Sequence, residues 1–201
     1  VHHQKINSPW SIHNQESRAE NELFQFGNGV LLEHFESMGI ELNWLVPDGK
    51  NSLHFIRNYF PENTPLLLVH NTYTSSQDID FLTSENILDR TWFSICAKAN
   101  VYIENRLPDI PLLSGKGCKI TIGTDSLASN DSLSVLEELK TIHHNFPEIP
   151  IEKLLRWATS NGATYFNWND LGAFRKNTTP GVVWITNASA ERFESNSAVT
   201  R

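Results

Sequence analysis

The stretch CKITIGTDSLASN, residues Cys118–Asn130, changes from a strand pattern to a carboxylate within a few positions. Apolar residues occupy every second position up to Ile122, which predicts a strand with one buried face. Gly123 and Thr124 break this pattern, and Asp125 follows them. A carboxylate directly after a buried strand costs free energy unless it is hydrogen-bonded or binds a ligand. Asp125 is therefore a candidate functional residue.

The strand before Asp125 belongs to a longer alternation of short apolar runs and amphipathic runs, which predicts an α/β fold with parallel strands. Further strands are expected over residues 9–13, 65–71, 91–97 and 180–186, and helices over residues 14–26, 50–60, 75–88, 130–146 and 150–166. We expect Asp131 or Ser132 to cap the helix of residues 130–146. We also expect Gly162 to allow close packing or to end a first helix, and the polar tail from Asn187 to fray.

Composition and charge narrow the class of protein. With 201 residues the chain is long enough to bury a core as one domain. A net charge of −7, without a cluster of Lys or Arg, argues against a nucleic-acid partner. No apolar run approaches the roughly 18 residues of a membrane span. Cys96 and Cys118 lie in apolar strand-like runs and need not pair, so we expect a reducing, cytoplasmic location. The chain begins without Met and reads like a cut taken inside a longer protein.

Reactive side chains fall at the carboxyl ends of three expected strands, namely His13, His70 and Asp125. In barrels of alternating strands and helices, this end of the strands carries the chemistry. Neutral imidazole and carboxylate are ligands of zinc and similar divalent metals, so the three residues predict a metal site. Glu16 follows on the next turn, where an unliganded carboxylate would carry protons between a water and a leaving group.

Each of these residues also has an ordinary structural interpretation. A histidine that ends a strand is more often a hydrogen-bonded residue of the core or rim than a ligand. Asp125 lies in Gly-Thr-Asp-Ser, which is good turn chemistry, and Glu16 would suit the positive end of a helix dipole. The coincidence of position across three strands favours the metal site, but the residues alone leave both interpretations open.

Several stretches resemble, in the right order, motifs of the amidohydrolase superfamily, in the branch of the cytosine, guanine and S-adenosylhomocysteine deaminases and the triazine chlorohydrolases. These stretches are SIHNQES, LLLVHNTYTSSQDIDFL, CAKANVYI, ITIGTDSLASN, WATSNGATYF and LGAFRKNTTPGVVWI. The strand-eight motif ITIGTDSLASN is the most specific of them. The similarity runs from about Pro9 to Thr186, and thus over nearly the whole chain.

This resemblance implies a fold and its boundaries. Residues 1–179 would form strands five to eight, the C-terminal half of a (β/α)8 TIM-like barrel. Residues 180–201 would form a strand that returns to a small β-sandwich, followed by a polar tail. The family's His-x-His pair, which supplies two metal ligands from strand one, is absent, because VHHQ at residues 1–4 has neither the spacer nor an apolar strand before it. Ala97 stands where the family usually has proline.

The resemblance also implies a role for each candidate residue. His13 would be a metal ligand, and Asp125 a second ligand that takes a proton from the attacking water. Glu16 would be the proton shuttle. His70 would contact the substrate or the developing tetrahedral centre and not the metal, in contrast to its grouping with the ligands above. Zinc is the expected divalent metal, with iron and manganese as alternatives.

The function implied is that of a metal-dependent hydrolase that cleaves C–N bonds, with deamination of a ring or purine-like small molecule as the leading expectation. The alternatives are a non-catalytic scaffold of the same fold, or a hydrolase with another leaving group, such as a chlorohydrolase or cyclic amidase. Because two ligands are missing, we expect these 201 residues alone to bind zinc weakly and to be inactive. The resemblance also implies an oligomer for the parent protein.

Overall fold

The computed structural model describes residues 9–200. A parallel sheet of four strands forms its centre, in the order β1 (Trp10–Asn14), β2 (Leu66–His70), β3 (Thr91–Ile95) and β4 (Lys119–Ile122). This confirms the α/β class with parallel strands. Within the described residues, β1 and β4 are the two edges of this sheet. The numbering of these strands as five to eight of a barrel stays a prediction.

The register of the sheet lines up apolar side chains in rows. Ile12 pairs with Leu68, Leu68 with Phe93, and Phe93 with Ile120. Because paired residues of neighbouring strands share a face, these four side chains form one row across the sheet. Three of them are fully buried in the main core, and Ile12 packs against it. His13 follows Ile12 and therefore points to the opposite face, where it is exposed.

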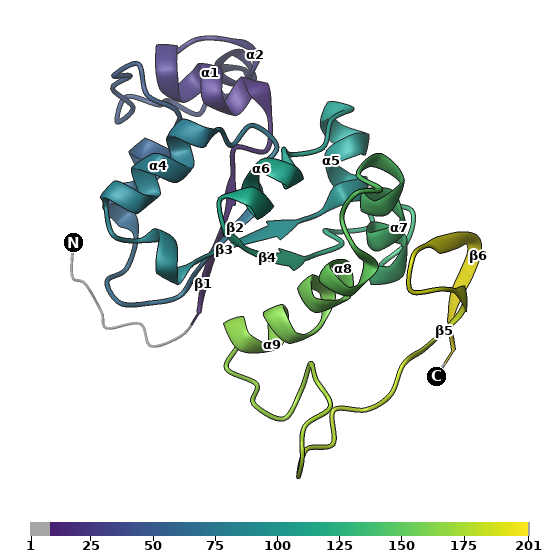
Figure 1. Ribbon diagram of the computed structural model, residues 1–201. Helices are drawn as coiled ribbons and strands as arrows, with labels where there is room; N and C mark the ends of the chain where they lie inside the picture. Colours follow the sequence, from purple (N-terminus) through teal and green to yellow (C-terminus); the bar gives the residue numbers. More distant parts are fainter. Residues whose placement is uncertain (1–8, 201) are drawn as a thin grey trace.

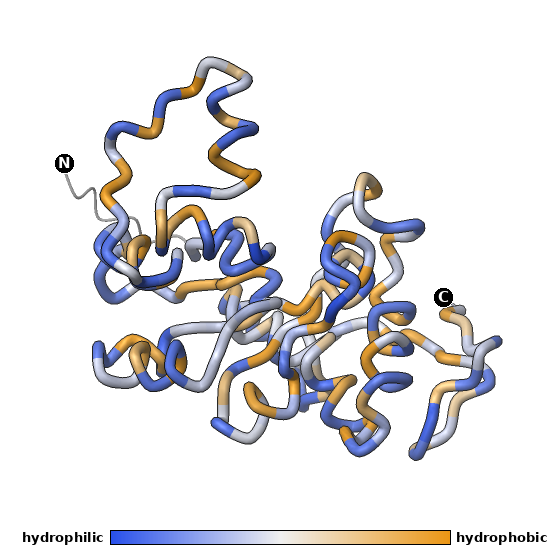
Figure 2. Tube along the Cα trace, turned by 90° about the horizontal axis from the view of Figure 1, so that it is seen from above, coloured by the Kyte–Doolittle hydropathy of each residue, from blue (hydrophilic) through white to orange (hydrophobic). Residues whose placement is uncertain are grey.

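Helices connect the strands and surround the sheet (Figure 1). Their bounds are α1 (Arg18–Phe26), α2 (Val30–Ser37), α3 (Ser52–Ile56), α4 (Ser76–Ser84), α5 (Ala97–Glu104), α6 (Ile110–Gly115), α7 (Val135–Asn145), α8 (Ile151–Ala158) and α9 (Ser160–Tyr165), with short 3₁₀ turns at Arg57–Tyr59 and Leu88–Arg90. Hydrophobic and hydrophilic stretches alternate along the helical segments, as expected for helices that turn one face toward a core (Figure 2).

The cap of α7 differs from the sequence expectation. The helix begins at Val135 and is capped by Ser134, whose hydroxyl accepts a hydrogen bond from the Glu137 N–H at 3.4 Å. Neither Asp131 nor Ser132 caps it, so that prediction is wrong. The reason is local, because the Asn130 side chain accepts from the Ser132 N–H at 3.2 Å and holds this residue in the preceding loop.

The predicted helix of residues 150–166 is broken into α8 and α9 at Thr159, whose φ of −130° and ψ of −86° interrupt the helix. Gly162 lies inside α9 with open space beside it, so the expectation that it ends a helix or allows close packing is wrong. The close approach occurs at Gly172 instead. A Cβ there would lie 2.8 Å from both the Ala163 Cβ and the Ser160 Cα.

The C-terminal residues form an antiparallel hairpin of β5 (Trp184–Ala188) and β6 (Phe193–Thr200) beside α7 (Figure 1). The expectation that the tail frays from Asn187 is therefore wrong. Phe193 packs against the core, and the Lys140 ammonium donates to the Ser195 carbonyl at 3.1 Å. These contacts with α7 order a segment whose polar composition suggested disorder. The small β-sandwich and the boundary at residue 180 stay predictions.

The two cysteines do not form a disulfide. Burial raises the pKa of the Cys96 thiol to about 12 and that of the Cys118 thiol to about 11, so both stay protonated near neutral pH. They are therefore poor nucleophiles and poor metal ligands. None of the helices in residues 9–200 is long and apolar enough to cross a membrane.

Candidate metal centre

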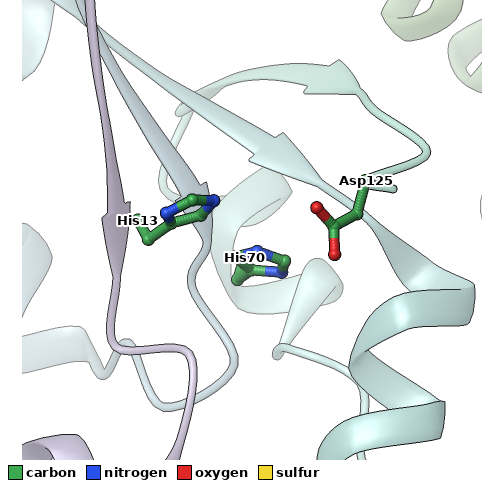
Figure 3. Close-up of side chains that lie close together, drawn as sticks. All are labelled: His13, His70 and Asp125. Atoms are coloured by element: carbon green, nitrogen blue, oxygen red, sulfur yellow. The ribbon is translucent and has the colours of Figure 1, made fainter. Parts of the chain in front are cut away.

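The side chains of His13, His70 and Asp125 meet at the carboxyl end of the sheet. One ligand atom from each lies within 4.8 Å of the corresponding atoms of the other two. Figure 3 shows the two imidazoles side by side, with the Asp125 carboxylate directed toward them. The structure thus brings together the three residues that the sequence placed at strand ends.

Neighbouring strands supply the two histidines. His13 lies on β1 and His70 ends β2, and these strands pair in parallel. The two rings stack, with their centroids 5.2 Å apart and their planes 29° apart. His13 is exposed, whereas His70 is only 1% exposed. One imidazole therefore faces open space while the other is fixed in the protein.

A left-handed turn directs His70 toward this site. The φ angles of His70 and Asn71 are 73° and 60°, which is uncommon for consecutive non-glycine residues. The buried Asn71 side chain stabilises the turn, since its Nδ2 donates to the Leu68 carbonyl at 2.7 Å and its Oδ1 accepts from Asn14 Nδ2 at 3.1 Å. This role of Asn71 was not expected from the sequence, although an Asn that directly follows a strand-end His is a signal for left-handed backbone.

Asp125 reaches the histidines by crossing the end of β3. The Gly123 N–H donates to the Ile95 carbonyl at 3.0 Å, and a Cβ at Gly123 would lie 3.0 Å from both Ser94 Oγ and Cys96 Sγ. Only glycine allows this close approach without a shift of those side chains. Asp125 itself has a φ of 55°, and its Oδ2 accepts a hydrogen bond from the Ser129 hydroxyl. The loop thus holds one carboxylate oxygen within the protein.

Glu16 lies at the same mouth, with its Oε1 3.4 Å from His70 Nε2. Glu20 holds the turn that carries it, because its carboxylate accepts from the backbone N–H groups of Gln15 at 2.9 Å and Glu16 at 3.0 Å. Ser17 caps α1 and accepts from the Glu20 N–H at 3.1 Å. Burial raises the pKa of Glu20. The role of Glu20 was not expected from the sequence, although Ser-x-x-Glu at a helix start is a capping-box signal.

The electrostatics around His70 favour its neutral form. Burial lowers the pKa of His70, and the nearby charges of Glu16 and Asp125 oppose that shift only in part. Neither ring nitrogen makes a hydrogen bond with the residues that the structure describes, and the approach of Glu16 is an ion-pair distance. A neutral, buried imidazole without a hydrogen-bond partner fits a metal ligand or a donor to a substrate.

The mouth of the site extends toward α5. Asn100 is buried there and donates to the Thr72 hydroxyl. Glu104 accepts from the Tyr73 hydroxyl at 2.6 Å. Beside the Asp125 loop lies an open hollow of about 300 Å³, whose lining includes Lys98, Tyr102, Leu127 and Ser129. The lining of the hollow includes Ser129, which donates to the Asp125 carboxylate, but none of the three candidate ligands.

Fold and site together define a class, namely α/β proteins with parallel strands whose carboxyl ends carry a His, His, Asp cluster suited to a divalent metal. The sequence profile of the amidohydrolase family matches residues 3–184. The chain belongs to the amidohydrolase family. This confirms the family that the motifs resemble.

Several known proteins of similar sequence and structure are deaminases. An adenosine deaminase from Helicobacter pylori (strain ATCC 700392 / 26695) is 24% identical over 183 residues, which cover 79% of this chain and 43% of that protein. An aminofutalosine deaminase from Helicobacter pylori in complex with methylthio-coformycin has a TM-score of 0.70 at 23% identity, over 85% of this chain and 41% of that one. An adenosine deaminase from Xanthomonas campestris with bound zinc has a TM-score of 0.61 at 20% identity, over 90% of this chain and 38% of that one.

Two facts follow from these similarities. At such low identity the structural likeness establishes a shared fold, which places the parallel sheet of this chain within a partial barrel. The chain also spans less than half the length of the relatives that it matches.

Proposed function

We propose that this chain forms one wall of the active site of a zinc-dependent deaminase that acts on a purine-like small molecule. The observation that carries the proposal is the convergence of His13, His70 and Asp125 within 4.8 Å, in a chain of the amidohydrolase family. The similarity to an adenosine deaminase and to a deaminase that binds methylthio-coformycin supports the purine-like substrate.

The residues present fit a divalent metal. Two imidazoles and a carboxylate are a donor set that zinc accepts, and the ring nitrogens of His70 lack hydrogen-bond partners within residues 9–200. His13 and Asp125 would hold the ion, together with the two ligands that the family resemblance places outside this sequence. A zinc ion held there would supply a nucleophilic water near neutral pH.

The side chains of this chain would then handle the protons and the developing charge. Asp125 would accept a proton from the attacking water, since one carboxylate oxygen is already fixed by Ser129. Glu16 would pass protons to a ring nitrogen or to the departing ammonia, from its place 3.4 Å from His70. His70 would stabilise negative charge on the tetrahedral centre. Because His70 also lies within ligand distance of the cluster, a place in the metal's coordination is the alternative for this residue.

Replacement of Asp125 by Asn tests the site directly. The amide keeps the shape of the side chain but removes the charge that attracts a cation, so zinc affinity should fall by more than about tenfold, the least that loss of a supporting partner usually costs. Competition with a chelator measures this affinity in the purified chain. Asp131→Asn is the matched control, since this exposed carboxylate lies in the same loop and pairs with Lys98.

Zinc bound by the Asp125→Asn chain as tightly as by the parent would refute the role of Asp125 as a ligand. For the reaction itself, the readout is release of ammonia from adenosine by a protein that holds this chain together with the two further ligands. Asp125→Asn should abolish that release, whereas Asp131→Asn should leave it unchanged.

A further inference from the structure

Glu138 is a buried carboxylate that the proposed chemistry does not use. It lies on α7 and is 0% exposed. Burial of a carboxylate costs several kcal/mol unless donors compensate for lost water, and burial here raises the pKa of Glu138. A leucine at this place in the helix would fill the space without that cost. The position of Glu138 therefore calls for an explanation in terms of its hydrogen bonds.

Each of the two carboxylate oxygens of Glu138 accepts one hydrogen bond. Oε2 accepts from the backbone N–H of Lys98 at 2.9 Å, in the first turn of α5, where helix N–H groups lack partners within the helix. Oε1 accepts from Asn130 Nδ2 at 2.7 Å. Glu138 thus joins the start of α5 to the loop between β4 and α7, and α5 and α7 pack against each other.

Asn130 extends this connection to the candidate metal centre. The same Nδ2 that donates to Glu138 also donates to the backbone carbonyl of Thr124 at 2.8 Å. Thr124 immediately precedes Asp125, whose left-handed backbone directs its carboxylate toward the histidines. A continuous chain of hydrogen bonds therefore runs from α5 through Glu138 and Asn130 to the backbone beside Asp125.

We propose that Glu138 is a positioning residue which, through Asn130, fixes the loop that carries Asp125 and thereby holds the Asp125 carboxylate at the metal centre. The proposal rests on the metal site proposed above and goes beyond it, since neither the sequence motifs nor the three-residue cluster includes Glu138. Its physical basis is that a loop crossing the sheet needs an anchor on a rigid element, and α7 provides it.

Glu138→Gln is the sharpest variant, because it keeps the size of the side chain. A glutamine offers one oxygen and one NH₂ group, so it would place a donor against either the Lys98 N–H or Asn130 Nδ2. If the Asn130 amide turned over to accept, it would lose its bond to the Thr124 carbonyl. The first arrangement loses the bond to α5 and the second loses the bond to the loop, so the connection from α5 to the loop is broken in either case. Glu137→Gln is the matched control, because Glu137 is the preceding residue of α7 and pairs with Lys140 outside this network.

The test uses the 201-residue chain and two readouts. Hydrogen exchange without metal reports the protection of amides 123–130, and chelator competition reports zinc affinity. We expect Glu138→Gln to speed exchange in this loop and to weaken zinc binding about tenfold, while Glu137→Gln changes neither. Unchanged loop protection in a folded Glu138→Gln chain would overturn the proposal. Faster exchange in the loop, together with a zinc affinity equal to that of the unsubstituted chain, would also overturn the proposal.

A second variant covers the case in which Glu138→Gln does not fold. Asn130→Ala leaves the bond from Glu138 to the Lys98 N–H. It removes the bonds from Asn130 to Glu138 and to the Thr124 carbonyl, together with the bond from the Ser132 N–H, so the same two results are expected of it. If the unsubstituted 201-residue chain binds no zinc, the proposed metal site is refuted. Loop exchange then decides the positioning role alone, and faster exchange supports it while unchanged exchange refutes it.

Discussion

At the scale of single residues, buried polar side chains fix the geometry of the site. Asn71 keeps the left-handed turn after β2, Glu20 holds the backbone of Glu16, and Asn130 holds the carbonyl before Asp125. None of these three is itself a candidate ligand or acid. The candidate ligands were predictable because His13, His70 and Asp125 share one position at the ends of three strands, although each residue alone also has an ordinary structural use. Their supporting residues were not, because an Asn or Glu in a polar loop looks like any solvent-exposed residue until its partners are known.

Asn71→Ala should destabilise the fold more than Asn105→Ala. Both residues have left-handed backbone, with φ of 60° and 48°, so both replacements carry a similar conformational cost. Asn71 is buried and its loss also leaves the Leu68 carbonyl and the Asn14 amide short of a partner, whereas Asn105 is exposed. The difference in the free energy of unfolding, measured with urea, should be about 1–3 kcal/mol. Equal losses would show that the buried hydrogen bonds contribute nothing.

At the scale of elements, the pattern of apolar residues located the strands and most helices, while the ends of elements depended on local contacts. β1 to β4 lie within a few residues of their expected bounds. The start of α7 moved to Val135 because of the turn at Asn130, and the long helix of residues 150–166 divided at Thr159. Before α7, side-chain to backbone hydrogen bonds compete with helix formation. At Thr159, the break lies beside the close approach of Gly172.

Gly172→Ala should be more harmful than Gly181→Ala. Both glycines have positive φ, 78° and 80°, so an added methyl group strains the backbone at either position by about 1 kcal/mol. At Gly172 the methyl group would also meet the backbone of α9 at 2.8 Å, whereas Gly181 faces open space. Urea unfolding should show an additional loss of about 1–3 kcal/mol for Gly172→Ala. Equal stabilities of the two variants would mean that the segment after α9 moves away without cost.

At the scale of the whole molecule, the described residues supply four neighbouring strands and two candidate metal ligands besides His70. β1, which carries His13, is an edge of this sheet, so nothing in residues 9–200 pairs with its outer side. The exposure of His13 follows from this position, while His70 on the next strand is buried. A complete coordination sphere around His13 would therefore need donors from outside these residues.

The 201-residue chain alone should bind zinc weakly and should not deaminate adenosine. The physical reason is that a metal held at one exposed edge strand lacks the ligands that the family resemblance assigns to a His-x-His pair. Ammonia release in the presence of zinc is the measurement, and a protein that adds the missing strands, with the strand that ends in His-x-His beside β4, is the comparison. Turnover by the chain alone would show that His13, His70 and Asp125 form a sufficient site.

The sequence by itself determined the α/β class, the four parallel strands, the amidohydrolase family and the identity of the residues at the mouth of the site, because these depend on local periodicity and on motifs within short stretches. Only the tertiary structure decided that Asp125 crosses β3 to meet two histidines from the strands beyond it. It also decided that Glu138, far along α7, is hydrogen-bonded into the loop that carries Asp125. The reason is that such contacts join residues distant in sequence, and their geometry arises only when helices and strands pack together.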